Sequence, residues 1–159
     1  MLGQEKEIIY IGSDHAGYPE KNELREYLKA QGYHVIDLGC FNEDSCDYPD
    51  IADEVGEKVS ENSDAKGVLF CGTGIGMSIA ANKLKGVRAA LCNDESSAEM
   101  ARRHNDANVI TMGARVTSPD QQKKIAMKFL TTEFEGAKDG GERHLRRVQK
   151  MSALENRNK

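Results

Sequence analysis

The stretch GVLFCGTGIGMSIAANK, residues 67–83, carries the pattern that decides the fold. Its first five residues form an apolar run of strand length, and the glycines that follow mark a tight turn. A helix is predicted to leave this turn, from about Met77 to Leu84. A buried strand that runs through a glycine-rich turn into a helix is typical of an α/β domain with a parallel sheet.

The same alternation of short apolar runs and longer amphipathic segments extends on both sides of this stretch. The predicted strands are residues 8–12, 34–38, 67–71, 87–92 and 109–112. The predicted helices are residues 19–31, 49–60, 77–84, 95–104 and 119–130, with a basic helix at 143–157. We therefore expect a single α/β domain over residues 1–159. The last helix, from about residue 142 to 157, has only a narrow apolar face, which is compatible with packing on a partner subunit.

Composition excludes several classes of protein. A chain of 159 residues can bury a substantial core in one domain. A net charge of −4 argues against a dedicated nucleic-acid binder, because phosphate binding needs a concentrated basic surface. No apolar run approaches the roughly 18 residues of a membrane span. The N-terminus has acids where a secretory signal carries basic residues. We expect a cytoplasmic protein that binds neither nucleic acid nor membrane.

The cysteines and histidines show no pattern of a metal site. There is no C-x-x-C pair, and the histidines lack zinc-ligand spacing. A cysteine in such a chain is most often a small buried apolar residue. The residues concerned are Cys40, Cys46, Cys71, Cys92, His34, His104 and His144. We expect no metal and no cofactor.

Glycines at 72, 74 and 76 indicate a loop that binds an anion. Such a loop points its N–H groups inward beside a helix N-terminus and can hold a phosphate or a developing enediolate oxygen. It is not a P-loop, because Gly76 is followed by Met77 and Ser78. The spacing also fits the dinucleotide fingerprint poorly, although Asp94 lies where a ribose-binding acid would be. A turn that merely needs glycine is the structural alternative.

Reactive side chains gather where the predicted strands end, which is where ligands bind in open α/β sheets. Cys71 directly precedes the glycine loop, a position that favours the thiolate, although it could also be an ordinary buried cysteine. Asp14 follows the first strand and could equally be a helix N-cap. His15 and His104 can each shuttle protons at neutral pH.

Arg143, Arg146 and Arg147 form a basic cluster near the C-terminus. Guanidinium groups match the oxygens of a phosphate and could clamp it. A solvated basic helix is the alternative, and it is favoured for Arg146.

Six motifs together resemble ribose-5-phosphate isomerase type B, a family that includes the galactose-6-phosphate isomerase subunits. They are SDHAG (13–17), DYPD (47–50), CGTGIGMSIAANK (71–83), RRHNDANV (102–109), GAR (113–115) and RHLRR (143–147). The resemblance implies a three-layer α/β/α sandwich with a five-stranded parallel Rossmann-like sheet. It also implies a homodimer or dimer of dimers, with sites shared between subunits, that interconverts ribose 5-phosphate and ribulose 5-phosphate through an enediolate.

The resemblance also assigns roles. Cys71 matches the base that moves a proton between C1 and C2. Asp14 and His104 match residues that open the furanose ring, and His104 with Asn105 is expected to serve the partner's site. The loop expected to hold the substrate and its enediolate is Gly72, Thr73, Gly74, Ile75 and Gly76. The remaining substrate ligands are Asn105 and the phosphate-binding group His15, Arg115, Arg143 and Arg147.

One departure and three alternatives remain open at this level. The segment AKDGGE separates Gly136 from Arg143, where the family places Arg-His directly after an EGG-like sequence. The substrate could instead be a six-carbon aldose such as allose or galactose 6-phosphate. The chain could also be a nucleotide- or cofactor-binding module, or a catalytically silent subunit. The presence of Cys71, His104 and Asp14 together argues against the last two.

Overall fold

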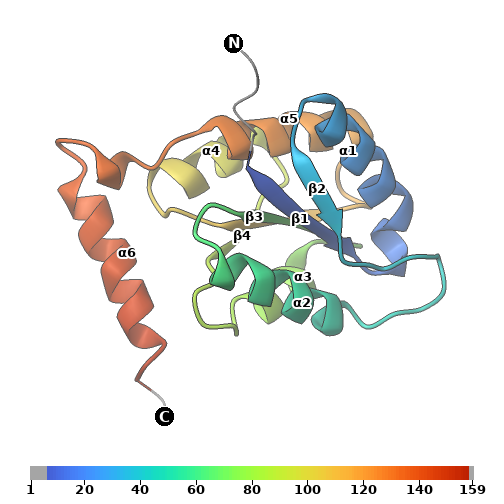
Figure 1. Cartoon of the computed structure of the whole chain (residues 1–159), viewed down its shortest axis with the longest axis horizontal. Helices are drawn as coiled ribbons and strands as arrows, with labels where there is room; N and C mark the ends of the chain where they lie inside the picture. Colours follow the sequence, from blue (N-terminus) through green and yellow to red (C-terminus); the bar gives the residue numbers. More distant parts are fainter. Residues whose placement is uncertain (1–6, 158–159) are drawn as a thin grey trace.

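A five-stranded parallel sheet forms the centre of the protein, as a computed structural model that describes residues 7–157 shows (Figure 1). The sheet order is β2-β1-β3-β5-β4, so β3 is the central strand, and β2 and β4 are the edge strands. The strands are β1 (Ile8–Ser13), β2 (His34–Asp37), β3 (Lys66–Cys71), β4 (Ala89–Leu91) and β5 (Val109–Gly113). The expected parallel sheet is thereby confirmed. The prediction that the chain has no secretory signal rests mostly on residues 1–6, which lie outside the described part of the chain.

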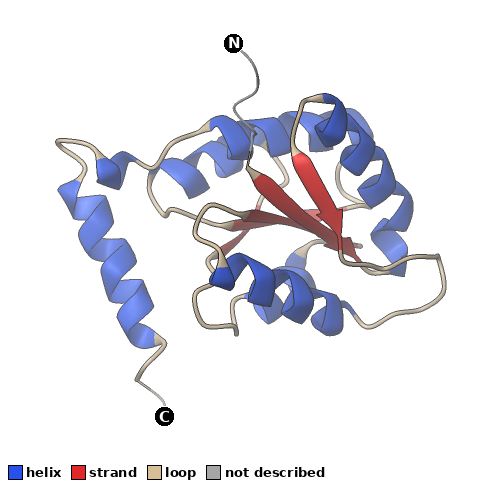
Figure 2. Cartoon of the chain, in the orientation of Figure 1, coloured by secondary structure: helices blue, strands red, loops and turns tan. Residues whose placement is uncertain are grey.

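Helices cover both faces of the sheet and complete the expected three layers (Figure 2). Helices α1, α4 and α5 pack on one face, while α2 and α3 pack on the other. The helices are η1 (His15–Gly17), α1 (Tyr18–Ala30), α2 (Tyr48–Glu61), α3 (Ile75–Ala81), α4 (Glu95–Arg103), α5 (Pro119–Thr131), η2 (Glu135–Ala137) and α6 (Glu142–Leu154). Among the described residues, no helix is long and apolar enough to cross a membrane.

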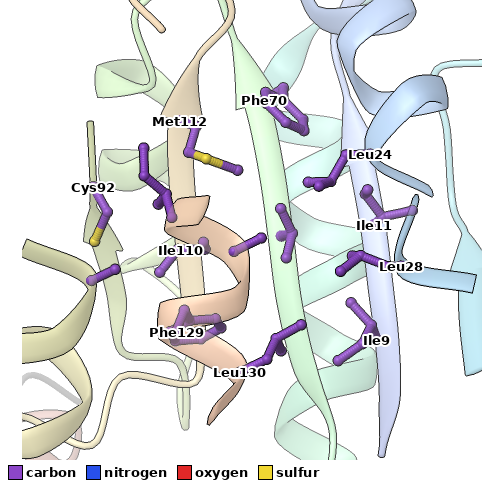
Figure 3. Packing of buried hydrophobic residues seen from close by; sticks show 14 of the residues in the cluster. Ile9, Ile11, Leu24, Leu28, Phe70, Cys92, Ile110, Met112, Phe129 and Leu130 are labelled. Carbon is purple, nitrogen blue, oxygen red and sulfur yellow. The ribbon is translucent and has the colours of Figure 1, made fainter. Parts of the chain in front are cut away.

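The alternation of side chains along β3 divides the core into two clusters. Val68 and Phe70 point toward α1 and α5, whereas Leu69 and Cys71 point toward α2 and α3. Figure 3 shows the first cluster, where apolar side chains of α1 and α5 pack over the strands. Its labelled members are Ile9, Ile11, Leu24, Leu28, Phe70, Cys92, Ile110, Met112, Phe129 and Leu130. Cys71 therefore ends a buried strand on the face covered by α2 and α3.

The element boundaries follow local hydrogen bonds. Helix α5 starts where expected, because Ser118 and Gln121 form a capping box around Pro119. Helix α3 and strand β4 are both shorter than the prediction. The reason is Asn82, whose side chain bonds both the N–H and the carbonyl of Ala89 at 2.8 Å and thereby ties the end of α3 to the start of β4.

A buried lysine fixes the loop that follows β2. Lys21 is fully buried, and its Nζ bonds Asp37 Oδ1 at 2.9 Å and also the carbonyl of Cys40. Arg25 holds the other oxygen of Asp37 at 2.7 Å. A buried ammonium group needs such partners, so this network holds the start of the loop against α1.

Helix α6 projects from the side of the domain (Figure 1). His144 and Val148 are its buried residues, whereas Leu145, Met151 and Leu154 remain exposed. Gly86 donates a hydrogen bond to Glu155 Oε1 at 2.9 Å just beyond the end of the helix. The apolar face expected from the sequence is therefore only partly covered within this chain.

Candidate active site

Cys71 and the glycine loop form one unit between β3 and α3. The N–H of Gly74 points at Cys71 Sγ, with the nitrogen 3.1 Å from the sulfur. Cys71 is only 5% exposed. An N–H directed at a sulfur donates a hydrogen bond to it, so the loop holds the side chain of Cys71 in place through its backbone. The loop thus brings Cys71 and the backbone N–H of Gly74 together.

Gly74 has a backbone conformation that the loop requires. Its φ is +81°, in the left-handed region, and a Cβ built there lies 2.6 Å from Leu91 Cδ1 and 2.9 Å from the carbonyl carbon of Met112. Thr111 Oγ1 also donates to the carbonyl of Gly74 at 2.8 Å. The glycine is therefore needed both for its φ and for the close approach of β5.

We expect Gly74→Ala to lower the free energy of unfolding by about 2–4 kcal/mol, from left-handed strain together with overpacking. Gly140→Ala is the matched control, because Gly140 has a φ of +90° but nothing within 4 Å of a built Cβ. The free energy of unfolding of this control should fall by only about 1–2 kcal/mol, because only the strain of the left-handed backbone acts at that position. Urea unfolding at matched protein concentration measures both. Equal losses in the two variants would contradict the role of the close contacts.

The described backbone brings three further predicted residues to Cys71. The N–H of Asp14 bonds the carbonyl of Phe70 at 3.1 Å, so Asp14 lies beside the end of β3. The N–H of Arg115 bonds the carbonyl of Gly72 at 3.0 Å, and Arg115 Nη1 lies 3.0 Å from a Cβ built on Gly72. His15 follows Asp14 directly. We call this group, with Gly72, Thr73 and Gly74, the cysteine edge of the sheet.

Asp14 also performs the structural role left open by the sequence. Its Oδ1 accepts hydrogen bonds from the N–H groups of Ala16 and Gly17, at 3.0 and 3.2 Å, and caps η1. His15 Nδ1 accepts a hydrogen bond from the N–H of Cys46 at 3.3 Å, which leaves Nε2 as the nitrogen available to a ligand. Both capping bonds of Asp14 go to Oδ1, so they orient the carboxylate without using Oδ2.

Asp94, which kept the cofactor interpretation open, caps α4. Its Oδ1 accepts a hydrogen bond from the N–H of Ser97 at 2.7 Å. This backbone hydrogen bond from Ser97 lowers the pKa of the Asp94 carboxyl. The neighbouring Asn93 is also engaged, since its Oδ1 accepts a hydrogen bond from the N–H of Gly113 at 3.1 Å. The structural roles of both residues weaken the cofactor interpretation.

His104 and Asn105 lie near the amino ends of the strands, at the edge of the sheet opposite to Cys71, which ends β3. They follow α4, which runs antiparallel to the strands, and they precede β5. Val109 at the start of β5 pairs with Gly67, whereas Cys71 pairs with Gly113. Four residues of a strand span about 13 Å. A single chain therefore does not bring His104 to Cys71.

Two arginines of the predicted phosphate clamp are on the same side as His104. Arg143 and Arg147 are exposed on α6, and the next residue after Arg143, His144, stacks on His104 with ring centroids 4.4 Å apart and planes within 6°. We call this group, with Asn105, the histidine edge. The predicted site residues thus fall into two groups, one at each edge of the sheet.

Glu135 lies against both stacked histidines and was missed at the level of sequence. Its Oε2 is 3.8 Å from His104 Nε2 and 3.6 Å from His144 Nε2. Arg103 Nε donates to Oε1 at 2.5 Å, and this bond lowers the pKa of Glu135. Burial lowers the pKa of His144 and favours its neutral form.

His104 and His144 lack zinc-ligand spacing in the sequence, but the fold brings them together. Together with Glu135 they place one nitrogen or oxygen ligand atom each within 4.8 Å of one another. Spacing rules detect ligands on one turn or one helix. These three residues come from separate elements, so no local spacing could reveal the cluster.

The fold and the cysteine edge define the class of protein: a Rossmann-like α/β protein in which a thiol lies against a glycine-rich turn between a buried strand and a helix. The sequence pattern of the family described as Ribose/Galactose Isomerase matches residues 9–151. The chain belongs to this family.

Several relatives are similar over nearly the whole chain. Ribose-5-phosphate isomerase B of Escherichia coli is 40% identical over 149 residues, covering 94% of this chain and 97% of the relative. The structure of ribose-5-phosphate isomerase B from Clostridium thermocellum has a TM-score of 0.90 and 44% identity, covering 96% of this chain and 99% of that one. The enzyme from Mycoplasma genitalium, solved with bound ribulose-5-phosphate, has a TM-score of 0.87 and 43% identity, covering 94% and 96%.

Proposed function

We propose that this chain interconverts ribose 5-phosphate and ribulose 5-phosphate, with Cys71 as the base. The observation that carries the activity is the near full-length similarity to ribose-5-phosphate isomerases B, one of them solved with ribulose-5-phosphate. These relatives do not favour the six-carbon alternative or the binding-module alternative. A cytoplasmic location and the absence of a cofactor remain predictions.

The direct test is an isomerase assay on purified protein with five- and six-carbon aldose phosphates side by side. We expect turnover of ribose 5-phosphate to exceed that of allose and galactose 6-phosphates. Preference for a six-carbon substrate would replace the proposed substrate, and inactivity on all of them would remove the proposed reaction.

The cysteine edge supplies what the proposed proton transfer needs. As a thiolate, Cys71 takes the proton from C2 of the open-chain aldose, and the electron pair of that C–H bond forms the enediolate. The thiol then returns the proton to C1, and the hydroxyl proton on O2 moves to O1, which gives the ketose. Backbone N–H groups of the loop stabilise the enediolate oxygen as charge develops. General-base help of this kind contributes roughly 10²–10⁴ to the rate.

Ring opening must come first, because the substrate is mainly a closed furanose, and this step involves both edges of the sheet. Asp14 is at the cysteine edge and His104 is at the histidine edge. We infer that a second copy of the chain brings its histidine edge to the cysteine edge of the first. A two-fold arrangement then creates two equivalent sites, each with Asp14 from one subunit and the partner's His104.

Exposed apolar side chains on α3 and on α6 support contact with a partner subunit at both helices. Ile75 and Ile79 on α3, beside the glycine loop, are 52% and 58% exposed. On α6, Leu145, Met151 and Leu154 are 39%, 38% and 56% exposed. Apolar residues grouped on one surface mark interaction sites more often than isolated ones do. We propose that α6 packs on the partner subunit and that α3 faces it.

The phosphate is proposed to lie between His15 and Arg115 of one subunit and the partner's Arg143 and Arg147. Planar guanidinium groups bind phosphate oxygens with two parallel hydrogen bonds, which suits this role. The inserted segment AKDGGE ends before the arginines, since α6 begins at Glu142, and Arg143 and Arg147 stay exposed. The insertion therefore leaves the clamp available.

We expect Arg147→Ala to weaken inhibition by inorganic phosphate by roughly 10-fold or more, the equivalent of one charged hydrogen bond. The turnover number should fall much less, because the phosphate is remote from the reacting carbons. Arg146→Ala is the control, since Arg146 is also exposed on the same helix but is not assigned to the clamp. The measurement is the inhibition constant of inorganic phosphate for both variants. An unchanged constant in Arg147→Ala would mean that α6 does not reach the phosphate.

A further inference from the structure

Three ligand-type side chains from three separate elements meet at the histidine edge. His104 caps the C-terminus of α4, Glu135 begins η2, and His144 lies in the first turn of α6. Their ligand atoms all lie within 4.8 Å of one another. Two imidazoles and one carboxylate form a common three-ligand set for zinc, which leaves the fourth position open.

The Nε2 atom of His144 faces the carboxylate of Glu135. His144 is only 5% exposed, and its Nε2 is buried without a hydrogen-bond partner among the described residues. A buried polar atom left unpaired destabilises the fold. The nearest partner is Glu135 Oε2, and the separation of 3.6 Å is too long for a hydrogen bond. A cation between the two atoms would satisfy both.

Arg103 prepares Glu135 for such a cation. It holds Oε1 at 2.5 Å and leaves Oε2 directed at both imidazoles. An arginine that bonds the second oxygen of a ligating carboxylate fixes the orientation of the ligand, as supporting residues do in metal sites. Arg103 is itself bonded to Glu99 at 3.4 Å, which anchors it to α4.

The distances suit a small transition-metal ion after one adjustment. Ligand atoms around tetrahedral zinc are roughly 3.4 Å apart, given metal–ligand bonds of about 2.0–2.2 Å. The two imidazole–carboxylate separations here are 3.8 and 3.6 Å. The rings are stacked within 6°, so one of them must tilt to direct its lone pair at the ion. His104 is the ring that can move, because its side chain is 38% exposed whereas that of His144 is 6% exposed.

We propose that His104, Glu135 and His144 bind a divalent transition-metal ion of the zinc class, and that the bound ion inhibits isomerisation by occupying Nε2 of His104. The inhibition rests on the proposed function, in which His104 opens the sugar ring. The site itself rests only on the geometry of the cluster. Inhibition should therefore affect the cyclic aldose, and a chelator should reverse it.

Binding is tested by titrating the metal-free protein with Co²⁺ and following its visible absorption. We expect the bands of a four-coordinate site without a thiolate charge-transfer band, since no cysteine belongs to the cluster. Glu135→Gln and His144→Asn should each weaken binding by at least roughly 100-fold, more than the loss of a supporting residue costs. Glu133→Gln is the control, because Glu133 is 76% exposed and pairs with Lys138 instead. Unchanged affinity in the two ligand variants would overturn the site.

A second measurement needs no variant and so does not depend on how a substitution affects folding. The chain has four histidines, and their imidazole nitrogens can be followed by ¹⁵N NMR of the intact protein. We expect Zn²⁺ to shift the Nε2 signals of His104 and His144 and to leave His34 unchanged. A shift confined to His15 or His34 would place the ion elsewhere and overturn the proposal.

Inhibition is then measured as the rate with ribose 5-phosphate across a Zn²⁺ titration, with and without chelator. Each variant is compared with its own metal-free rate. We expect Zn²⁺ to inhibit the parent and Glu133→Gln, and to inhibit Glu135→Gln only at about 100-fold higher concentration. Binding at the cluster without inhibition would overturn the link to His104. If the chain has no isomerase activity, the proposed function fails, while the Co²⁺ titration still decides the site.

Discussion

Cys71→Ala should lower the turnover number for ribose 5-phosphate by roughly 10²–10⁴ or more, the contribution of a general base. The physical reason is that Cys71 Sγ is the potential base that the structure holds against the N–H of Gly74 in the glycine loop. Substrate binding should be largely retained, because the phosphate is proposed to be held by other residues. Incorporation of solvent deuterium at the substrate carbon should disappear together with turnover.

Cys92→Ala is the matched control for this experiment. Cys92 is fully buried in the cluster under α4 and α5, and burial raises the pKa of its thiol to about 12, so it remains protonated at neutral pH. Its substitution should keep turnover near that of the parent at a modest cost in stability. Near-normal turnover and deuterium exchange in Cys71→Ala would require a different base.

His104→Ala should cripple turnover of the cyclic aldose and spare proton exchange on an open-chain ketose. An imidazole can donate and accept protons at neutral pH, which ring opening requires and the later transfer by Cys71 does not. The measurement compares the aldose turnover number with the rate of deuterium exchange on ribulose 5-phosphate. Equal losses in both would place His104 in the proton-transfer step instead.

Mixing inactive His104→Ala with inactive Cys71→Ala should restore activity if the two edges of the site come from different subunits. Half of randomly exchanged dimers are mixed and each has one intact site of two, so recovery should approach about a quarter of the parent rate. Each variant incubated alone is the control, and mass-tagged subunits confirm exchange. If exchange is confirmed and no activity returns, both residues must serve the site of one subunit. That result would contradict the proposal that the two edges of the site come from different subunits.

The parallel sheet and the cysteine edge could be predicted from contiguous residues. The apolar run of residues 67–71 determines a buried strand, and the glycines after it determine a turn that presents the N–H of Gly74 to Cys71. Since parallel strands bring their carboxyl ends to one edge, the placement of Asp14 and His15 beside Cys71 also followed from local patterns. Apolar periodicity and glycine conformation depend on residues that are close in the sequence, so they can be predicted without knowledge of the tertiary contacts.

The histidine edge was decided only by the tertiary structure. Helix α4 runs antiparallel to the strands, which places His104 far from Cys71 although the two share one predicted site. The close approach of Glu135 and His144 to His104 depends on how η2 and α6 fold back against the end of α4. These contacts join residues far apart in the chain, and no local periodicity or spacing encodes them. Packing between elements therefore determined which ligand atoms meet, while the sequence determined the elements themselves.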